Sequence, residues 1–227
     1  MRTTSVLSLH CSSLLFGFLA ASPAAADDTQ LWLAFTTRTS LAGPLELHAD
    51  TNARWIDGMR HVGHIQFRAM LGWRLPSKTL VSGGYSYVRA DQLSGGTVFE
   101  HRPFQQLNVP LGKIGKAQLS TRTRFEQRLF SNFSGVTLRL RQQVSLAIPI
   151  DHASGLEVIV ETEPFFVLNA PSGTDVPTGF HQIRTFAGIN LPISPQIAIE
   201  AGYLNQHILP DGGRTNHNLS LTLATRF

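Results

Sequence analysis

The sequence is poor in cysteine and lysine and has no long apolar run beyond its N-terminus. Its single cysteine is Cys11, and its only lysines are Lys78, Lys113 and Lys116. Cys11 lies in a segment that we expect to be removed, so the mature protein is expected to have no thiol chemistry and no disulfide. After residue 26 no apolar run is long enough for a membrane-spanning helix, which excludes a helical membrane protein. A membrane barrel stays possible, because each of its strands is only half apolar.

The first 26 residues have the pattern of a secretory signal peptide. Arg2 gives a positive start, an apolar stretch runs from about Val6 to Ala21, and Ala24-Ala25-Ala26 form an A-x-A cleavage site. The apolar stretch is shorter than the roughly 20 residues that a membrane anchor needs. We therefore predict a cleaved signal peptide over 1–26 and a single exported domain over 27–227, of the sandwich or barrel kind.

The charge of the mature chain is modest and evenly spread. Removing Arg2 lowers Lys+Arg from 19 to 18, and the 15 acidic residues then leave a formal charge of +3. The sequence pI of 9.7 is compatible with nucleic-acid binding, but the arginines are distributed through alternating segments and form no basic cluster on one loop or helix. We therefore expect no nucleic-acid partner.

Alternation of apolar and polar residues with a period of two dominates the mature chain. It is clearest over 136–148, where the apolar face is interrupted only by Gln142 and the other face carries Arg139 and Arg141. A strand of this sequence has one apolar and one polar side, whereas a helix would place arginine around its whole circumference. The same alternation predicts eleven strands, near 30–40, 45–56, 61–75, 79–90, 99–111, 116–130, 135–150, 155–168, 179–193, 196–208 and 217–227.

The lengths of these segments favour a membrane barrel over a soluble sandwich. Soluble strands average roughly five or six residues, while a tilted membrane-spanning strand needs about nine to eleven. The predicted fold is an all-β, antiparallel, up-and-down transmembrane β-barrel of about 10–12 strands. Because single-chain bacterial barrels have even strand numbers, we expect ten or twelve strands rather than the eleven segments counted.

The connections between the predicted strands fall into two sets. Short turns rich in Gly, Pro, Ser and Asp lie at 41–44, 76–78, 112–115, 151–154 and 194–195. The other set contains the longer loops 91–98, 169–178 and 208–216, and two brief links at 57–60 and 131–134. Short turns at one rim and longer loops at the other are typical of the outer membrane of Gram-negative bacteria, with the short turns in the periplasm.

Alternation alone does not tell which face meets hydrocarbon, and a soluble exported sandwich or lipocalin-like barrel has the same pattern. Strand length favours the membrane, and the final residue, Phe227, resembles the C-terminal recognition signal of the outer-membrane assembly machinery. The Trp and Tyr residues also lie mostly toward strand ends, where aromatic belts form: Trp32, Trp55, Trp73, Tyr85, Tyr87 and Tyr203. We therefore expect an outer-membrane protein whose partners are outer-membrane lipid and the barrel-assembly machinery.

In this arrangement the charged residues line the lumen. The basic ones are Arg54, Arg68, Arg74, Arg102, Arg122, Arg124, Arg128, Arg139, Arg141, Arg184 and Arg226, and the acidic ones are Glu46, Asp50, Glu100, Glu126, Glu157, Glu161, Glu163 and Glu200. Arginine–carboxylate pairs of this kind form strong contacts across a ladder. The network is either structural, closing a narrow barrel, or the wall of a small anion-preferring channel. The structural interpretation is favoured, because a barrel of this size has little spare lumen.

A series of motifs resembles a known family. Glu100-His101-Arg102-Pro103-Phe104-Gln105-Gln106, Arg122-Thr123-Arg124-Phe125-Glu126-Gln127-Arg128, Arg139-Leu140-Arg141, Gln182-Ile183-Arg184 and Gly202-Tyr203-Leu204-Asn205-Gln206 follow one another after the early Trp32. Their order and spacing resemble the bacterial outer-membrane family catalogued as domain of unknown function 2490. The resemblance covers essentially the whole mature chain and implies an outer-membrane barrel of unassigned activity, with no catalytic residues to carry over.

No catalytic or metal-binding set emerges from the sequence. His217 and Ser220 fall on opposite faces of one strand, His61 and His64 do the same, and His101 points away from Glu100 and Arg102. No HExxH motif, glycine-rich phosphate loop or nucleophile elbow occurs. We therefore predict no cofactor and no metal, and we favour a protein without enzymatic activity. Two alternatives stay open, an outer-membrane enzyme acting on lipid or lipopolysaccharide and a soluble periplasmic ligand-binding barrel.

Overall fold

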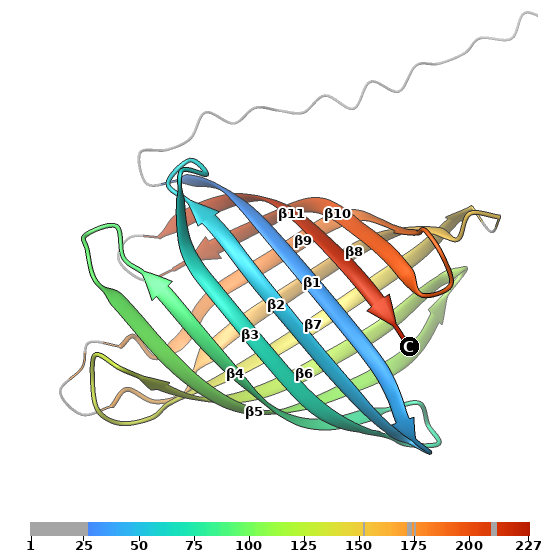
Figure 1. The fold of residues 1–227 in the computed structure, drawn as a ribbon, viewed down its shortest axis with the longest axis horizontal. Coiled ribbons are helices and arrows are strands. Elements are labelled where there is room, and N and C mark those ends of the chain that lie inside the picture. Colours follow the sequence, from blue (N-terminus) through green and yellow to red (C-terminus); the bar gives the residue numbers. More distant parts are fainter. Residues whose placement is uncertain (1–26, 152, 172–173, 175, 210–212) are drawn as a thin grey trace, which may run out of the picture.

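The structure is a computed structural model that describes residues 27–227 except 152, 172–173, 175 and 210–212. The predicted signal peptide and Cys11 lie outside the described residues. The described chain is all-β (Figure 1), with the strands β1 (Asp28–Ala42), β2 (Leu45–Ile56), β3 (His61–Arg74), β4 (Leu80–Asp91), β5 (Thr97–Ile114), β6 (Ala117–Phe130), β7 (Thr137–Asp151), β8 (Leu156–Val167), β9 (Gly179–Pro192), β10 (Ile197–Ile208) and β11 (Arg214–Arg226). None of the residues described forms a helix long and apolar enough to cross a bilayer.

The eleven strands form a closed barrel in which each strand pairs with its neighbour in sequence. All of these neighbouring pairs are antiparallel, and the barrel closes by a parallel pairing of β1 with β11, in register from Asp28↔Asn216 to Arg38↔Arg226. The all-β barrel is confirmed, but the expectation of ten or twelve strands is wrong. In a meander with an odd number of strands, the first and last strands run in the same direction, so closure requires a parallel pair.

The connections separate the barrel into two ends. The connections β1–β2, β3–β4, β5–β6, β7–β8 and β9–β10 form what we call the short-turn end, and those that follow the even-numbered strands form the loop end. In Figure 1 the loop end lies on the left and the short-turn end on the right. Because β1 and β11 are parallel, β1 begins at the loop end and the chain ends with Phe227 at the short-turn end.

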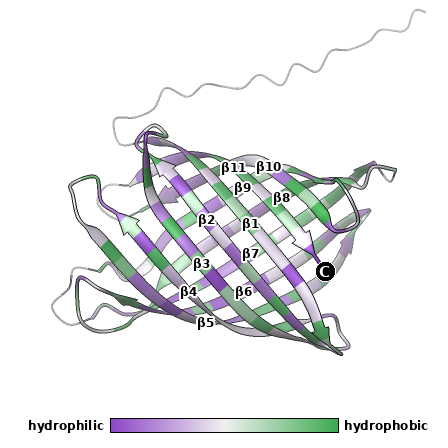
Figure 2. Ribbon diagram, in the orientation of Figure 1, coloured by the Kyte–Doolittle hydropathy of each residue, from purple (hydrophilic) through white to green (hydrophobic). Residues whose placement is uncertain are grey.

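The two faces of the sheet have opposite polarity. Large apolar side chains of every strand point outward and are exposed, as with Phe67 at 58% and Trp73 at 54%. The side chains of opposite parity point inward, and the buried ones include Glu100, Arg124 and Glu126. Figure 2 shows this alternation as successive hydrophobic and hydrophilic bands along the strands. The apolar row therefore lies outside and the charged row is enclosed, with a polar core instead of the apolar core of a soluble domain.

The aromatic residues at strand ends divide between the two faces. Trp73, Tyr85, Tyr87 and Tyr203 are exposed on the outer face. Trp32 is an exception, because it is only 5% exposed and its indole donates a 2.8 Å hydrogen bond to the inward amide of Gln30. Its assignment to an outer aromatic belt is therefore wrong. The parity of Trp32 along β1 is that of Gln30, and this places both side chains inside.

Candidate functional site

The half of the interior nearer the loop end is filled by arginine, glutamate and aromatic side chains, which we call the charged plug. At its centre is Glu126 of β6, whose side chain has no contact with solvent. Arg139 Nε donates to its Oε2 at 2.6 Å, and Arg141 Nη1 donates to its Oε1 at 3.0 Å. Both arginines come from β7, the strand hydrogen-bonded to β6, and Arg139 lies directly opposite Glu126 in register.

Two further glutamates complete the carboxylates of the plug. Glu163 of β8 accepts from Arg141 at 2.7 and 3.1 Å and from Arg122 at 2.8 Å, so that Arg141 bridges Glu126 and Glu163. Glu100 of β5 accepts two hydrogen bonds from each of two arginines, Arg102 at 2.6 and 2.7 Å and Arg128 at 2.7 and 2.9 Å. These forked, charge-assisted contacts are the strong class of hydrogen bond.

Arginines outnumber the carboxylates in the plug, and aromatic rings take up part of the excess. The ring of Phe165 in β8 lies beneath three guanidinium groups, with centroid distances of 4.4 Å to Arg141, 4.7 Å to Arg184 and 5.3 Å to Arg139. An aromatic face is electrostatically negative, and its attraction for a cation is strongest where water is excluded. Phe165 is itself fully buried, so these contacts are of the strong kind.

Two more rings play the same part. The guanidinium of Arg124 lies 4.7 Å from the ring of Phe104 in β5, and that of Arg68 lies at 6.0 Å. In β1 the ring of Trp32 has Arg54 at 3.8 Å and Arg184 at 4.9 Å. Among the described residues neither Arg54 nor Arg184 has a carboxylate within ion-pair distance. Arg54 instead lies over the Trp32 ring, and Arg184 lies over the rings of both Trp32 and Phe165.

Sequence reasoning found the charged members of the plug but not its aromatic ones. The signal was present, because Phe104 shares the parity of Arg102 and Phe165 shares that of Glu163. The glycine opposite Phe104 was missed as well. Phe104 lies so close to Gly84 of β4 that a Cβ placed on Gly84 would be 2.5 Å from the ring, which only glycine avoids. A glycine on the inner wall thus provides the space that the ring fills.

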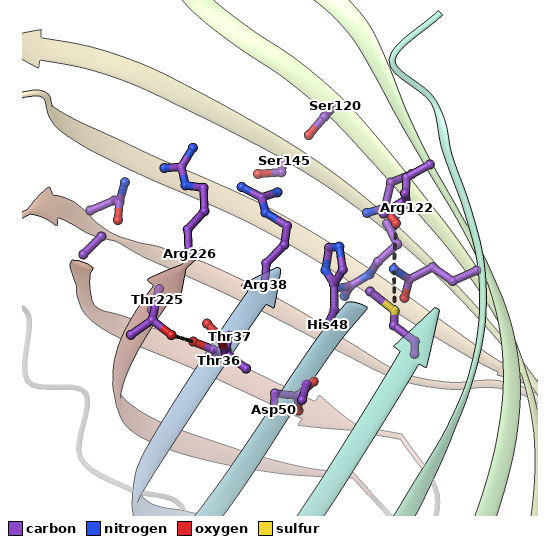
Figure 3. A pocket seen from close by; sticks show the side chains of 18 of the residues that line it. Thr36, Thr37, Arg38, His48, Asp50, Ser120, Arg122, Ser145, Thr225 and Arg226 are labelled. Carbon is purple, nitrogen blue, oxygen red and sulfur yellow. Dashed lines mark hydrogen bonds between the residues drawn. The ribbon is translucent and has the colours of Figure 1, made fainter. Parts of the chain in front are cut away.

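The half of the interior nearer the short-turn end contains a cavity of about 880 Å³. Its wall includes Arg68, Arg122 and Arg124 at the boundary with the plug, and it extends to Lys78 and Gln196 in the turns at the rim. Figure 3 shows the side chains of this cavity, with Arg38 and Arg226 side by side on β1 and β11. The interior is therefore divided into a filled half and a hollow half.

Most charges of the cavity wall are paired. Arg74 Nη2 donates to Glu46 Oε2 at 2.8 Å and Arg74 Nε to Glu46 Oε1, while His48 Nε2 lies 2.9 Å from Glu46 Oε2. Arg68 Nη1 and Asp50 Oδ2 are 3.6 Å apart. These contacts leave the guanidinium groups of Arg38 and Arg226 without a side-chain hydrogen bond or ion pair to any described residue.

Two glutamates expected in the charged network lie apart from it. Glu161 lines the cavity and accepts from the Gln143 amide at 2.5 Å, and Glu200 of β10 lies opposite Thr222 and Asn190. Neither has an arginine within ion-pair distance among the described residues. The structure thus brings together twelve of the fourteen expected network residues as plug or cavity-boundary contacts, namely Arg54, Arg68, Glu100, Arg102, Arg122, Arg124, Glu126, Arg128, Arg139, Arg141, Glu163 and Arg184.

The expected assembly signal, Phe227, lies at the short-turn end with its side chain 71% exposed. Its backbone continues the β1–β11 ladder: its N–H donates to the Arg38 carbonyl at 2.9 Å, and its carbonyl accepts from the Ser40 N–H at 3.1 Å. Phe227 is therefore held in the pairing of β1 with β11, which we call the closing seam, and its ring projects from the barrel surface.

None of the described histidines has a serine hydroxyl as a hydrogen-bond partner. His217 Nδ1 lies 2.6 Å from the Tyr203 hydroxyl, and His101 Nδ1 is hydrogen-bonded to the Tyr85 hydroxyl, both on the outer face. Within the described part of the chain, no group of three or more His, Cys, Asp or Glu could hold a metal ion.

Comparison with known proteins gives a family but no activity. A family model described as a protein of unknown function (DUF2490) matches residues 29–217, which confirms the family that the sequence motifs indicated. An uncharacterized protein of Methylorubrum extorquens (strain ATCC 14718 / DSM 1338 / JCM 2805 / NCIMB 9133 / AM1) is 34% identical over 212 residues, which cover 91% of this chain and 91% of the relative.

Proposed function

The chain belongs to the family of proteins of unknown function DUF2490, and we propose that it is an outer-membrane β-barrel whose interior is closed rather than an open diffusion pore. The observation that carries the proposal is the reversed polarity of the barrel. Arg124, Glu126 and Arg141 are buried, while large apolar side chains cover the outer face. A barrel in lipid has this arrangement, because its outer surface meets acyl chains and its interior holds the polar groups.

The length of the strands supports the membrane location. The strands have 12 to 18 residues, and a tilted membrane strand needs about nine to eleven. In water the outer surface would expose an apolar band around the whole barrel, far beyond the few hundred square ångströms that soluble monomers expose. The sheet closes on itself, so no strand has an unpaired edge. A lipid environment requires this closure, because the backbone N–H and C=O groups of an open edge would have no hydrogen-bond partners there.

The charged plug supports the closed interior. Glu126, Phe165 and Phe104 have essentially no solvent contact, so water does not reach the centre of the loop-end half. An open pore needs a continuous polar path wide enough for hydrated ions. The forked contacts of Glu100, Glu126 and Glu163 hold the arginines in place across the interior, and separating them would leave buried charges unpaired at a high cost.

In this proposal the lengths of the connections set the orientation of the barrel in the membrane. The short-turn end faces the periplasm and the loop end faces outward, as in other outer-membrane barrels. Phe227 then lies at the periplasmic end, where the assembly machinery would meet it, and the cavity opens toward the periplasm. The signal peptide over 1–26 provides the export step.

Fractionation of a Gram-negative host that produces the full chain tests the location. We expect the protein in the outer-membrane fraction, without residues 1–26 by mass spectrometry, and we expect the folded barrel to migrate differently before and after boiling. Recovery in the soluble periplasm with unchanged migration would show that the protein is not a membrane barrel.

Conductance in planar bilayers tests the closed interior separately. We expect no single-channel events from the folded protein over a wide voltage range, because the plug blocks the path. Regular, reproducible conductance steps from protein whose fold has been verified would overturn the closed interior and support a narrow pore.

A further inference from the structure

The closing seam of the barrel, where β1 pairs with β11, carries a row of basic side chains. Arg226 of β11 lies directly opposite Arg38 of β1 in the parallel register, and Arg38 lies directly opposite His48 of β2. Like charges placed opposite each other on neighbouring strands destabilise a sheet. The protein nevertheless holds two arginines in this arrangement at the point where the barrel closes.

The surrounding carboxylates do not relieve this repulsion. Glu46 acts on Arg38 electrostatically, but its carboxylate is hydrogen-bonded to Arg74, lies 2.9 Å from His48 Nε2, and makes no ion pair with Arg38. Asp50, deeper in the cavity, lies beside Arg68, and Glu161, the other carboxylate that lines the cavity, accepts from Gln143 and makes no ion pair with either seam arginine. The five N–H donors of each seam guanidinium therefore find no acceptor on a described side chain.

Both seam arginines project into a space that can hold a ligand. Figure 3 shows their side chains extending in parallel into the cavity. The cavity of about 880 Å³ falls within the range of roughly 300 to 1,000 Å³ of small-molecule sites. Its wall also presents the hydroxyl group of Ser120 on β6. The cavity thus combines the two unpaired guanidinium groups with a neutral hydrogen-bond donor.

We propose that Arg38 and Arg226 form a binding site for the phosphate group of a small solute, which enters the cavity from the short-turn end. Two adjacent guanidinium groups match the charge of a phosphate, and the planar fork of arginine matches its oxygens bidentately. The bound anion would supply the counter-charge that the seam lacks. The proposal depends on the proposed function only for the route of entry, because the plug leaves the short-turn end as the way in.

Titration of the folded protein in a non-phosphate detergent tests the site, with inorganic phosphate and glycerol 3-phosphate as separate probes at 0.15 M sodium chloride. We expect saturable binding by calorimetry and an affinity at least tenfold lower in Arg38→Gln and Arg226→Gln. The phosphate affinity of Arg38→Lys is expected to lie between those of the glutamine variants and the unchanged protein, because lysine keeps the charge but lacks the planar fork of arginine.

Arg89→Gln is the matched control. Arg89 is also a strand arginine, but it points outward near the loop end and pairs with Asp91 at 2.9 Å. Its replacement is expected to leave phosphate affinity unchanged. The two probes separate the sources: tighter binding of glycerol 3-phosphate indicates an organic phosphate, and tighter binding of inorganic phosphate indicates the free ion.

Stability measurements show whether a substitution lowers phosphate affinity only because it disturbs the fold. Because the seam arginines repel each other, we expect Arg226→Gln to be at least as resistant to urea as the unchanged protein when phosphate is absent, and added phosphate to stabilise only the unchanged protein. Absence of saturable binding, or equal affinity in Arg226→Gln, would overturn the site. Neither result depends on where the protein fractionates or on whether it conducts.

Discussion

Glu126 is the residue on which the charged plug depends most, because it neutralises two buried arginines at once. In Glu126→Gln the amide keeps the shape of the side chain but removes the charge that compensates Arg139 and Arg141. Breaking a buried pair in this way costs about 3–5 kcal/mol. We therefore expect a large decrease in the free energy of unfolding, measured by urea titration of the protein in detergent.

Glu157→Gln provides the comparison for that loss. Glu157 lies near the short-turn end and accepts a single 3.2 Å hydrogen bond from the Asn190 amide. Its replacement removes no buried charge pair, and we expect a change of about 1 kcal/mol or less. Equal effects of the two substitutions would show that the buried carboxylate has no special role.

Gly84 and Gly83 offer a second test within one strand. A Cβ on Gly84 would lie 2.5 Å from both the Ala69 carbonyl oxygen and the Phe104 ring, whereas a Cβ on Gly83 would have no heavy atom within 4 Å. We expect Gly84→Ala to lower stability by about 1–3 kcal/mol through overpacking. Gly83→Ala should change it by about 0.5 kcal/mol or less. The same urea titration checks both, and a reversed order would mean that Phe104 is not held against the inner wall.

The individual strands could be predicted because each carries its own alternation. Segment 45–56 coincides with β2, and the predicted strands elsewhere differ from the structure mainly at their ends, as in β5, which continues to Ile114 instead of 111. Within a strand, parity also assigns the inner face, so the inward positions of Arg139 and Arg141 followed from the sequence. The parity of Trp32 also predicts an inward side chain, but its tryptophan side chain favoured the outer aromatic belt.

The closing pair could not be predicted from local pattern. Strands β1 and β11 are separated by almost the whole chain, and each alternates regardless of its partner. The preference for even strand numbers rests on both ends of the chain lying on one side of the membrane. In this protein the start of β1 and the end of β11 lie at opposite ends of the barrel, which the parallel pair makes possible.

Crosslinking tests the parallel seam directly. Leu33 and Leu221 are register partners and share the outer face, while Thr225 lies four residues further along β11. In a Cys11→Ser background we expect Leu33→Cys with Leu221→Cys to be joined by a short thiol crosslinker, and Leu33→Cys with Thr225→Cys to be joined poorly. Electrophoresis without boiling detects the product. Efficient joining of the second pair only would contradict the register.

For the whole molecule, the sequence indicated the class of fold and the charged lining but not the division of the interior. The plug and the cavity differ in how the side chains of eleven strands meet across the lumen, and those contacts depend on strand tilt and register. The unpaired state of Arg38 and Arg226 is a consequence of the same geometry, which places Glu46 against Arg74 and His48 and not within ion-pair distance of Arg38. Contacts of this kind have no signature in a single sequence.

In the proposed membrane barrel the apolar row meets hydrocarbon and the arginine row is enclosed. Fluorescent labels on Leu71→Cys, an outward position, and Ser120→Cys, a cavity position, test it in vesicles. We expect spin-labelled acyl chains to quench the label at residue 71 and iodide in the water to quench the label at residue 120. Quenching of residue 71 by iodide together with quenching of residue 120 by the acyl chains would show that the apolar row does not face lipid.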